Sequence, residues 1–263
     1  MKILVCIKQV PDTNEVKIDF KTGTLIRDGV PSIINPDDKN ALEAALVLKE
    51  EHPGTTVTVI TMGPPQADAA LREALAMGAD NAVLVTDRAF GGSDTYATSN
   101  VLLAGIQALK EDFDLYLCGR QAIDGDTAQV GPQLAEKLDL PQITYAGDIK
   151  VEGNKVIVKR MLEDGYMMIE APMPCLLTAV KELNEPRFAS LGGIIDAYQS
   201  DIRWITAEDV PDIDFSVIGL KGSPTIVFRS FTPAPKGKGE MLPGADKETV
   251  ALLAEKLRAK HII

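Results

Sequence analysis

The stretch Leu115-Tyr-Leu-Cys-Gly119-Arg-Gln-Ala-Ile-Asp124-Gly-Asp-Thr-Ala-Gln-Val-Gly-Pro-Gln-Leu134 decides the fold of this 263-residue chain. Its apolar run ends at Cys118, Gly119 breaks it, and from Thr127 onward the apolar residues fall at helical spacing. These residues predict a buried strand, a loop and the start of a helix. Such a junction places free backbone N–H groups and a positive helix end at the carboxyl edge of a sheet, where a phosphate is stabilised.

Two interpretations of this loop remain open. In the first, Gly125 and Gly131 permit a ligand to approach the backbone closely, and Thr127 offers it a hydroxyl. In the second, the loop is a simple turn in which Asp126 or Thr127 caps the helix. The loop matches neither Walker A nor the G-x-G-x-x-G pattern. A phosphate would also be repelled by Asp124 and Asp126 unless both side chains point away from it.

Composition narrows the class of function. The chain carries 27 Lys and Arg against 38 Asp and Glu, a net charge of −11, which argues against nucleic acid as a partner because a polyanion is bound by clustered basic residues. The amino-terminal apolar run is too short for a signal peptide or a membrane span. We therefore expect a cytoplasmic protein without a membrane span.

The cysteines and histidines suggest neither a metal site nor a protein-borne catalyst. Cys6, Cys118 and Cys175 are far apart and lie in apolar runs, which predicts core thiols in a reducing compartment. His52 and His261 lie away from any nucleophile or carboxylate pattern, so neither is predicted to be catalytic. If the protein does redox or transfer work, a bound organic cofactor would carry the chemistry.

Strands and helices alternate around the opening stretch. Apolar runs predict strands at residues 2–7, 56–61 and 81–86, and helical spacing predicts helices after Asn35, at 66–77 and from Asp94 to about residue 110. A small hairpin is expected between the segments 16–19 and 24–27, and a loop at 8–13. The alternation favours a mostly parallel sheet with helices on both faces. Loops that leave the strand ends should meet in one crevice, where a nucleotide would bind. Asn35 and Asp38 either only cap their helix or also line this crevice.

Beyond residue 141 the pattern changes. Short alternating segments at 142–145, 148–151, 155–161 and 166–170 predict an antiparallel extension of the sheet, and 175–180 predicts one more buried strand. The glycine-rich apolar segment 191–195 suits either a flexible partner-binding loop or core packing. From residue 211, prolines at 224, 233, 235 and 243 and the charged run 236–240 predict an extended arm, which ends in an amphipathic helix at 246–260. The predicted domains are therefore 1–210 and 211–263.

Five separated motifs give the chain a family resemblance. They are Val-Cys-Ile-Lys-Gln-Val at 5–10, Asn35-Pro, Ala-Met-Gly-Ala-Asp at 76–80, the opening loop through Pro132, and Leu-Asn-Glu-Pro-Arg-Phe-Ala-Ser-Leu at 183–191. In this order they resemble the beta, or small, subunit of the electron-transfer flavoproteins, in register to about residue 200. The resemblance implies an adenine-nucleotide α-hydrolase-like fold, a heterodimer with a larger alpha subunit, and a site for AMP or, in the electron-bifurcating branch, a second FAD.

The resemblance also implies which residues do this work. Carried over by position, the cofactor would contact Cys6, Ile7, Lys8, Asn35, Asp38, Met62, Gly63, Asp94, Thr95, Ala122, Ile123, Asp124, Gly125, Asp126, Thr127, Gln129, Val130, Gly131, Pro132 and Gln133. The partner dehydrogenase would contact Arg187, Phe188, Leu191 and Ile194. The carboxyl-terminal arm would wrap onto the alpha subunit and help to frame its FAD domain.

Several residues are similar to the bifurcating branch. Gly125 and Thr127 are small where AMP-holding members carry bulkier residues, which leaves room for a pyrophosphate, and the segments 10–13 and 93–98 also resemble that branch. The resulting hypothesis is that FAD in the crevice takes a hydride from NADH. One electron would go to ferredoxin or flavodoxin, and the other through the alpha-subunit FAD to an acyl-CoA-type dehydrogenase of anaerobic metabolism. Asp196 departs from the lysine-rich continuation of animal members, so recognition of their dehydrogenases is not implied.

Two alternatives belong to other classes of protein. One is a non-bifurcating beta subunit that holds a structural AMP. The other is an ATP-using ligase or stress-protein-like nucleotide binder of the same broad fold. The ligase would need an S-G-G-x-D-S loop after the first strand, where this chain has Lys-Gln-Val-Pro-Asp at 8–12.

Overall fold

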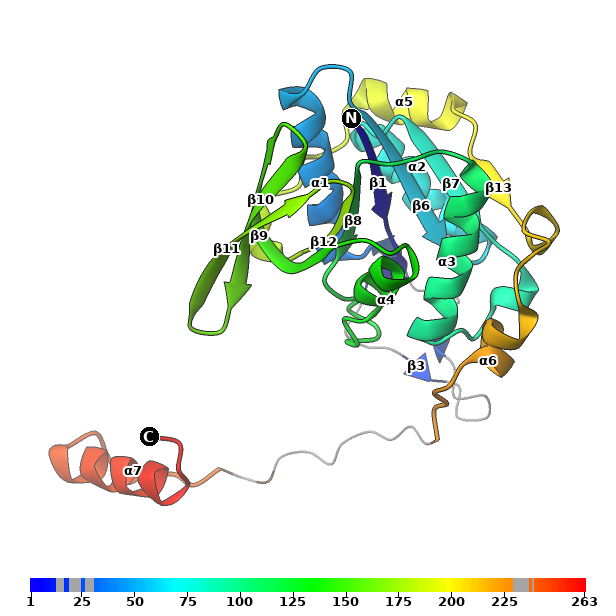
Figure 1. Ribbon diagram of the computed structural model, residues 1–263. Coiled ribbons are helices and arrows are strands. Elements are labelled where there is room, and N and C mark those ends of the chain that lie inside the picture. The colour runs from blue at the N-terminus through cyan, green and yellow to red at the C-terminus, as the bar shows by residue number, and fades with distance from the viewer. Residues whose placement is uncertain (13–16, 19–24, 27–30, 229–236, 238) are drawn as a thin grey trace. The chain divides into compact units, whose positions relative to one another are not determined.

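The amino-terminal apolar run forms β1 (Lys2–Cys6), an inner strand of the main sheet in the computed structural model (Figure 1). The structure describes residues 1–12, 17–18, 25–26, 31–228, 237 and 239–263. Within them, one sheet has the strand order β11 (Gly165–Pro172), β10 (Lys155–Leu162), β9 (Gln142–Glu152), β12 (Cys175–Ala179), β8 (Leu115–Gly119), β1, β6 (Thr56–Met62), β7 (Asn81–Val85) and β13 (Arg203–Ile205). From β9 to β13 all neighbours are parallel, and β10 and β11 continue the sheet antiparallel. The predicted α/β class with its antiparallel extension is confirmed.

Helices cover both faces of the parallel part (Figure 1). One face carries α1 (Pro36–Glu51), α2 (Asp68–Met77) and α5 (Leu191–Gln199), and the other carries α3 (Thr95–Leu109) and α4 (Val130–Lys137). Alternate residues of β1 feed the two cores, since Ile3 packs in the first and Leu4 in the second. Both side chains are fully buried, which is worth about 1.5–3 kcal/mol each.

The opening stretch forms the predicted strand and helix, but the helix begins later than expected. The N-cap of α4 is Gln129, and its side chain makes no cap hydrogen bond. The prediction that Asp126 or Thr127 caps this helix is therefore wrong. The physical reason is the backbone, because Asp126 (φ 45°) and Ala128 (φ 54°) adopt left-handed conformations that cannot continue a right-handed helix.

Three short strands and two helices, α5 and the four-residue α6 (Gly219–Gly222), were not predicted. The expected loop after β1 contains β2 (Gln9–Pro11), which pairs antiparallel with β5 (Ser32–Ile34), and β13 closes the far edge of the sheet. The predicted hairpin is seen as β3 (Lys17–Ile18) paired with β4 (Leu25–Ile26), while its turn lies outside the described residues. The prediction of a loop at 191–195 is wrong, because these residues begin α5. Ser190 caps this helix by accepting a hydrogen bond from the Gly193 backbone N–H.

Residues 211–227 belong to the first of two compact units, Met1–Val227 and Phe228–Ile263. They contain a 3₁₀ turn (Phe215–Val217) and α6 (Gly219–Gly222), following further 3₁₀ turns at Pro65–Ala67, Arg88–Phe90, Lys181–Leu183 and Ala207–Asp209. The second unit contains α7 (Lys247–Ala259), capped by Asp246, which confirms the predicted carboxyl-terminal helix. Pro233, Pro235 and Lys236 of the predicted arm lie outside the described residues.

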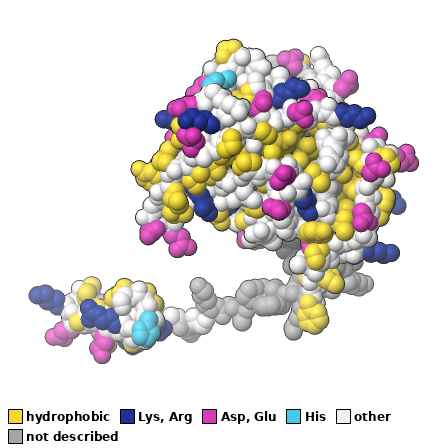
Figure 2. Space-filling model, viewed as in Figure 1, with side chains coloured by type: hydrophobic (Ala, Val, Ile, Leu, Met, Phe, Trp, Pro, Cys, Tyr) yellow, Lys and Arg dark blue, Asp and Glu magenta, His cyan; other side chains and the backbone are white. Residues whose placement is uncertain are grey.

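The outer strands leave apolar surface at one edge of the sheet. Tyr166, Met167 and Met168 of β11 are all exposed, and Figure 2 shows hydrophobic side chains gathered over these antiparallel strands. Among the described residues, no helix is long and apolar enough to cross a membrane.

Candidate functional site

A pocket of about 1540 Å³ opens where the parallel strands end. β1 lies between β6 and β8, and the chain leaves β1 toward β6 but returns to its other side through β8. Ligands of open α/β sheets bind in the crevice at such a switch point, outside the carboxyl ends of the strands. The predicted convergence of the loops on one crevice is therefore seen.

The pocket brings together predicted cofactor residues from five separate segments. Those that line it are Cys6, Ile7, Lys8, Asp38, Met62, Gly63, Asp94, Thr95, Ala122, Gly125, Thr127, Gln129, Val130 and Gly131. The structure places Asn35, Ile123, Asp124, Asp126, Pro132 and Gln133 outside this lining. Binding of a nucleotide by any of these residues stays a prediction.

Asn35 holds the organising loop from behind. It occupies the N-cap position of α1, but its side chain makes no cap hydrogen bond. Instead its Nδ2 donates to the Gln121 carbonyl at 2.8 Å, and its Oδ1 accepts from the Ile123 N–H at 3.0 Å. The expected cap is therefore a tether between α1 and the loop that follows β8.

Asp38 joins the ends of two strands. Its carboxylate accepts from the backbone N–H of Lys8 at 2.8 Å and from that of Gly119 at 3.0 Å. A Cβ on Gly119 would lie 2.2 Å from Asp38 Oδ1, so only glycine fits there. Burial raises the pKa of Asp38 to about 7, against the opposing effect of hydrogen bonds from Asn35, Lys8 and Gly119.

The two loop carboxylates do not face the pocket. Asp124 is only 6% exposed and pairs with Lys8, whose Nζ donates to its Oδ1 at 2.6 Å. Asp126 accepts from Gln121 Nε2 at 2.8 Å. Neither residue lines the cavity. Both side chains therefore point away from the pocket, which was the condition under which they would not repel a phosphate there.

The two glycines of the loop differ in what they permit. A Cβ on Gly125 would meet nothing within 4 Å, so this position opens onto free space. A Cβ on Gly131 would lie 2.8 Å from Thr178 Cγ2. Gly131 therefore lets α4 pack closely on β12. The sequence had instead suggested that this glycine lets a ligand approach the backbone.

The start of α3 forms the opposite wall. Asp94 caps the helix by accepting from the Ala97 N–H at 3.0 Å, and its Oδ2 accepts from the Thr225 N–H at 3.0 Å and from the Thr225 hydroxyl at 2.7 Å. Desolvation raises the pKa of Asp94, but the hydrogen bonds from Ala97 and Thr225 outweigh it and leave the pKa below its usual value. The carboxylate therefore fastens the chain at Thr225 to the pocket rim.

Several residues that line the pocket were not predicted from the sequence. Further lining residues include Thr86, Arg88, Phe90, Arg120, Trp204, Thr206 and Thr225. Thr86 and Arg120 directly follow β7 and β8, and the rule that ligands sit at strand ends could have found them. Trp204 lies on the three-residue strand β13, which is too short to give a pattern.

Two thiols form part of the floor. Cys6 and Cys118 are register partners on β1 and β8, and both line the pocket. A hydrogen bond with Cys6 and burial raise the pKa of the Cys118 thiol well above its usual value. Cys6, Cys118 and Cys175 are all free and buried, as predicted.

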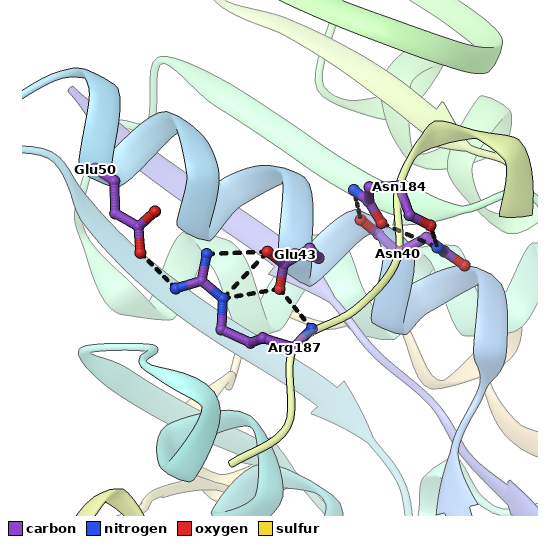
Figure 3. A network of polar contacts seen from close by, with 5 residues as sticks. All are labelled: Asn40, Glu43, Glu50, Asn184 and Arg187. Carbon is purple, nitrogen blue, oxygen red and sulfur yellow. Dashed lines mark hydrogen bonds and ion pairs between the residues drawn. The ribbon is translucent and has the colours of Figure 1, made fainter. Parts of the chain in front are cut away.

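The predicted partner residues divide into two groups. Phe188 is 98% exposed and Leu191 is 78% exposed, and Ile194 is exposed as well. Arg187 instead turns inward to α1, where Glu43 and Glu50 accept its hydrogen bonds (Figure 3). Three of the four predicted partner residues are therefore exposed apolar side chains, and the fourth is bonded to α1.

Comparison with known proteins identifies the family. Residues 22–210 match the model of the electron transfer flavoprotein domain. Over the full length of both chains, the protein is 62% identical to subunit CarD of the caffeyl-CoA reductase-Etf complex of Acetobacterium woodii. With the same coverage it is 58% identical to the electron transfer flavoprotein subunit beta of Thermoanaerobacterium thermosaccharolyticum and 54% identical to the acryloyl-CoA reductase electron transfer subunit gamma of Anaerotignum propionicum. The chain therefore belongs to the electron transfer flavoprotein family, as one of its beta subunits.

Proposed function

We propose that the pocket holds FAD and that the chain, paired with an alpha subunit, bifurcates the electrons of NADH. The proposed acceptors are ferredoxin or flavodoxin and, through the alpha-subunit FAD, an acyl-CoA-type dehydrogenase. The observation that carries the proposal is the size of the pocket, which at about 1540 Å³ exceeds the roughly 300–1,000 Å³ of ordinary ligand sites. A full dinucleotide suits this space better than a mononucleotide does.

The residues present fit such a group. Gly125 leaves space beside the loop, and the N-terminal end of α4, whose N-cap Gln129 makes no side-chain cap hydrogen bond, supplies backbone N–H groups that favour a diphosphate. Arg88 supplies positive charge along the lining, while the charges of Lys8 and Arg120 there are offset by Asp124 and Asp37. Met62, Phe90, Leu102 and Val130 supply apolar walls that exclude water.

The chain's own residues bind and orient, while the chemistry belongs to the cofactor. Bound FAD would accept the hydride and release electrons one at a time. Asp38 and Asn35 hold the loops that surround it, and the raised pKa of the Cys118 thiol keeps negative charge off that part of the floor. No side chain of this site is assigned a catalytic role.

Two relatives support the partner class. Their names associate them with caffeyl-CoA and acryloyl-CoA reduction. We propose that this chain likewise serves an acyl-CoA-type dehydrogenase, which docks on the exposed side chains of Phe188, Leu191 and Ile194.

Counting the cofactors of the purified heterodimer tests the proposal. Denaturation should release FAD beyond that of the alpha subunit, and no AMP. Trp204 is the chain's single tryptophan and lines the pocket, so titrating FAD into flavin-depleted complex should quench its fluorescence. Release of AMP in place of the additional FAD would contradict the proposal and support the structural-AMP alternative.

Electron flow gives a second test. NADH oxidation should reduce ferredoxin only while the acyl-CoA dehydrogenase and its substrate are present, since the two electron transfers are proposed to be coupled. Ferredoxin reduction that proceeds without the dehydrogenase would contradict bifurcation.

A further inference from the structure

The segment that presents the docking side chains is fastened to α1 by polar contacts that are largely part-buried (Figure 3). Arg187 Nη2 donates to Glu43 Oε1 at 2.9 Å, and its Nε donates to Glu43 Oε2 at 2.9 Å. The Arg187 backbone N–H donates to the same carboxylate at 3.0 Å. Such a forked, charge-assisted pair fixes both direction and distance. Phe188, the next residue, is 98% exposed.

A second cluster fixes the same segment one turn earlier on α1. Asn40 Nδ2 donates to the Asn184 carbonyl at 2.8 Å and to Asn184 Oδ1 at 2.9 Å. Asn184 Nδ2 donates back to the Asn40 carbonyl at 3.0 Å. The stretch 184–187 therefore has a contact with α1 at each end.

The guanidinium of Arg187 is committed to α1. Hydrogen bonds with Glu43, and then with Glu50, raise its pKa. The Glu43 side chain is 7% exposed, whereas that of Glu50 is 63% exposed. Removing one partner of the buried pair leaves an uncompensated charge, whereas an exposed pair contributes little. Glu43 is therefore the anchor of this contact.

The same helix also holds the pocket. Asn35 and Asp38, at its start, tether the loops after β1 and β8, and Asn40 and Glu43 follow on its next turns. At a rise of about 1.5 Å per residue, Asp38 and Glu43 are separated by roughly 7.5 Å along the axis. One rigid element thus sets the place of the pocket loops and of the docking segment.

We infer that Arg187 is a positioning residue, which acts through Glu43 of α1 to hold Phe188 and Leu191 in the arrangement that the dehydrogenase recognises. It does not itself contact the dehydrogenase. This inference rests on the docking role proposed above for Phe188, Leu191 and Ile194. It assigns a share in partner recognition to Glu43, whose side chain is only 7% exposed.

The experiment uses the holo heterodimer with Glu43→Gln, Arg187→Lys and the double variant. The matched control is Glu51→Gln, an exposed glutamate on the same helix. Turnover is measured against a panel of acyl-CoA dehydrogenases and reductases that includes caffeyl-CoA reductase, using the acceptor for which the unchanged complex has the lowest KM. FAD content and NADH oxidation by an artificial acceptor are measured alongside.

Glu43→Gln should raise the KM for the dehydrogenase by about tenfold, the cost of weakening one charge-assisted contact, and leave kcat unchanged. Arg187→Lys should do the same, because lysine keeps the charge but loses the fork. The double variant should be no worse than the poorer single variant, since both changes break one contact. Glu51→Gln, FAD content and artificial-acceptor turnover should match the unchanged complex.

Two outcomes would overturn the inference. One is a KM that Glu43→Gln leaves unchanged while Arg187→Lys raises it, which would mean that Arg187 touches the dehydrogenase directly. The other is an equal loss of artificial-acceptor turnover, which would mean general damage. Leu191→Ala separates this inference from the proposed function. If Leu191→Ala leaves the KM unchanged, the proposed docking surface is wrong. If Leu191→Ala raises the KM but Glu43→Gln and Arg187→Lys do not, the docking surface stands and only the positioning role is wrong.

Discussion

At the scale of single residues, the pocket depends on which glycines have free space beside them. Gly119 faces Asp38 Oδ1 and Gly131 faces Thr178, so a side chain at either position must displace protein atoms. Gly125 faces open space. The three glycines look alike in the sequence, yet only at Gly125 can a larger side chain test for a ligand without displacing protein atoms.

Gly125→Leu should leave the stability of the chain nearly unchanged and remove the FAD of the pocket, because the new side chain enters the space proposed for the diphosphate. Thermal unfolding and FAD content per heterodimer are the measurements. Gly165→Leu is the matched control, since Gly165 also faces open space but lies on β11. Gly119→Ala should instead destabilise the chain by about 1–3 kcal/mol through overpacking. FAD content that Gly125→Leu does not change would mean that the site is misplaced.

Asp38 predicts a pH dependence of stability. Its folded-state pKa of about 7 lies above the ordinary value of 3.8, so between these values the folded chain binds more protons than the unfolded chain. The free energy of unfolding should therefore fall as pH rises from about 4 to about 7, with the contribution of Asp38 fully present below this window and lost above it. Urea unfolding of the unchanged chain and of Asp38→Asn across this range measures the effect. An identical pH profile for the two would contradict the assignment.

At the scale of elements, α1 and α3 organise the site from opposite sides. α1 holds the loops after β1 and β8 through Asn35 and Asp38. α3 holds the segment near residue 225 through its cap, Asp94. In both cases a side chain at the start of a helix bonds to a distant segment, and for Asn35 this replaces capping altogether.

Asp94→Ala should cost about 1 kcal/mol of stability through the lost cap, and it should also weaken FAD retention because Thr225 is released from the rim. Ser190→Ala removes a cap of the same kind from α5 and should leave FAD retention unchanged. Denaturant unfolding and the dissociation constant for FAD are measured for both. Equal FAD retention in the two variants would show that the Thr225 tether does not matter to the pocket.

At the scale of the whole molecule, the chain divides into a unit that contains the pocket and a unit that contains α7. Val250, Leu252 and Leu253 of α7 are exposed within their own unit. An amphipathic helix whose apolar residues stay exposed is typical of a segment that docks on another chain. We propose the alpha subunit as its partner.

A chain that ends at Val227 should therefore keep the fold of the first unit and lose stable association with the alpha subunit, because the apolar residues of α7 are gone. Circular dichroism checks the fold, and light scattering of the mixed subunits checks the association. A full-length chain with Glu248→Gln, which keeps the apolar residues, serves as the control. Heterodimer formation by the shortened chain at the same affinity would exclude α7 from the interface.

The sequence by itself determined the alternation of strands and helices, the crevice at the switch point and the family. Apolar periodicity and glycine breaks are local signals, and the order of strands in a doubly covered sheet follows from them by general rules. The resemblance to electron-transfer flavoproteins likewise rests on short, local sequence motifs.

Only the tertiary structure decided where the polar side chains of those motifs point. Asn35 forms hydrogen bonds with Gln121 and Ile123, which lie 86 and 88 residues further along the chain. Asp38 bonds to Gly119, and Arg187 bonds to Glu43, 144 residues earlier. The start of α4 and the short strand β13 were missed for the related reason that left-handed residues and three-residue strands carry no periodic signal. A side chain's partner depends on which distant segment the fold brings beside it, and no local pattern records that.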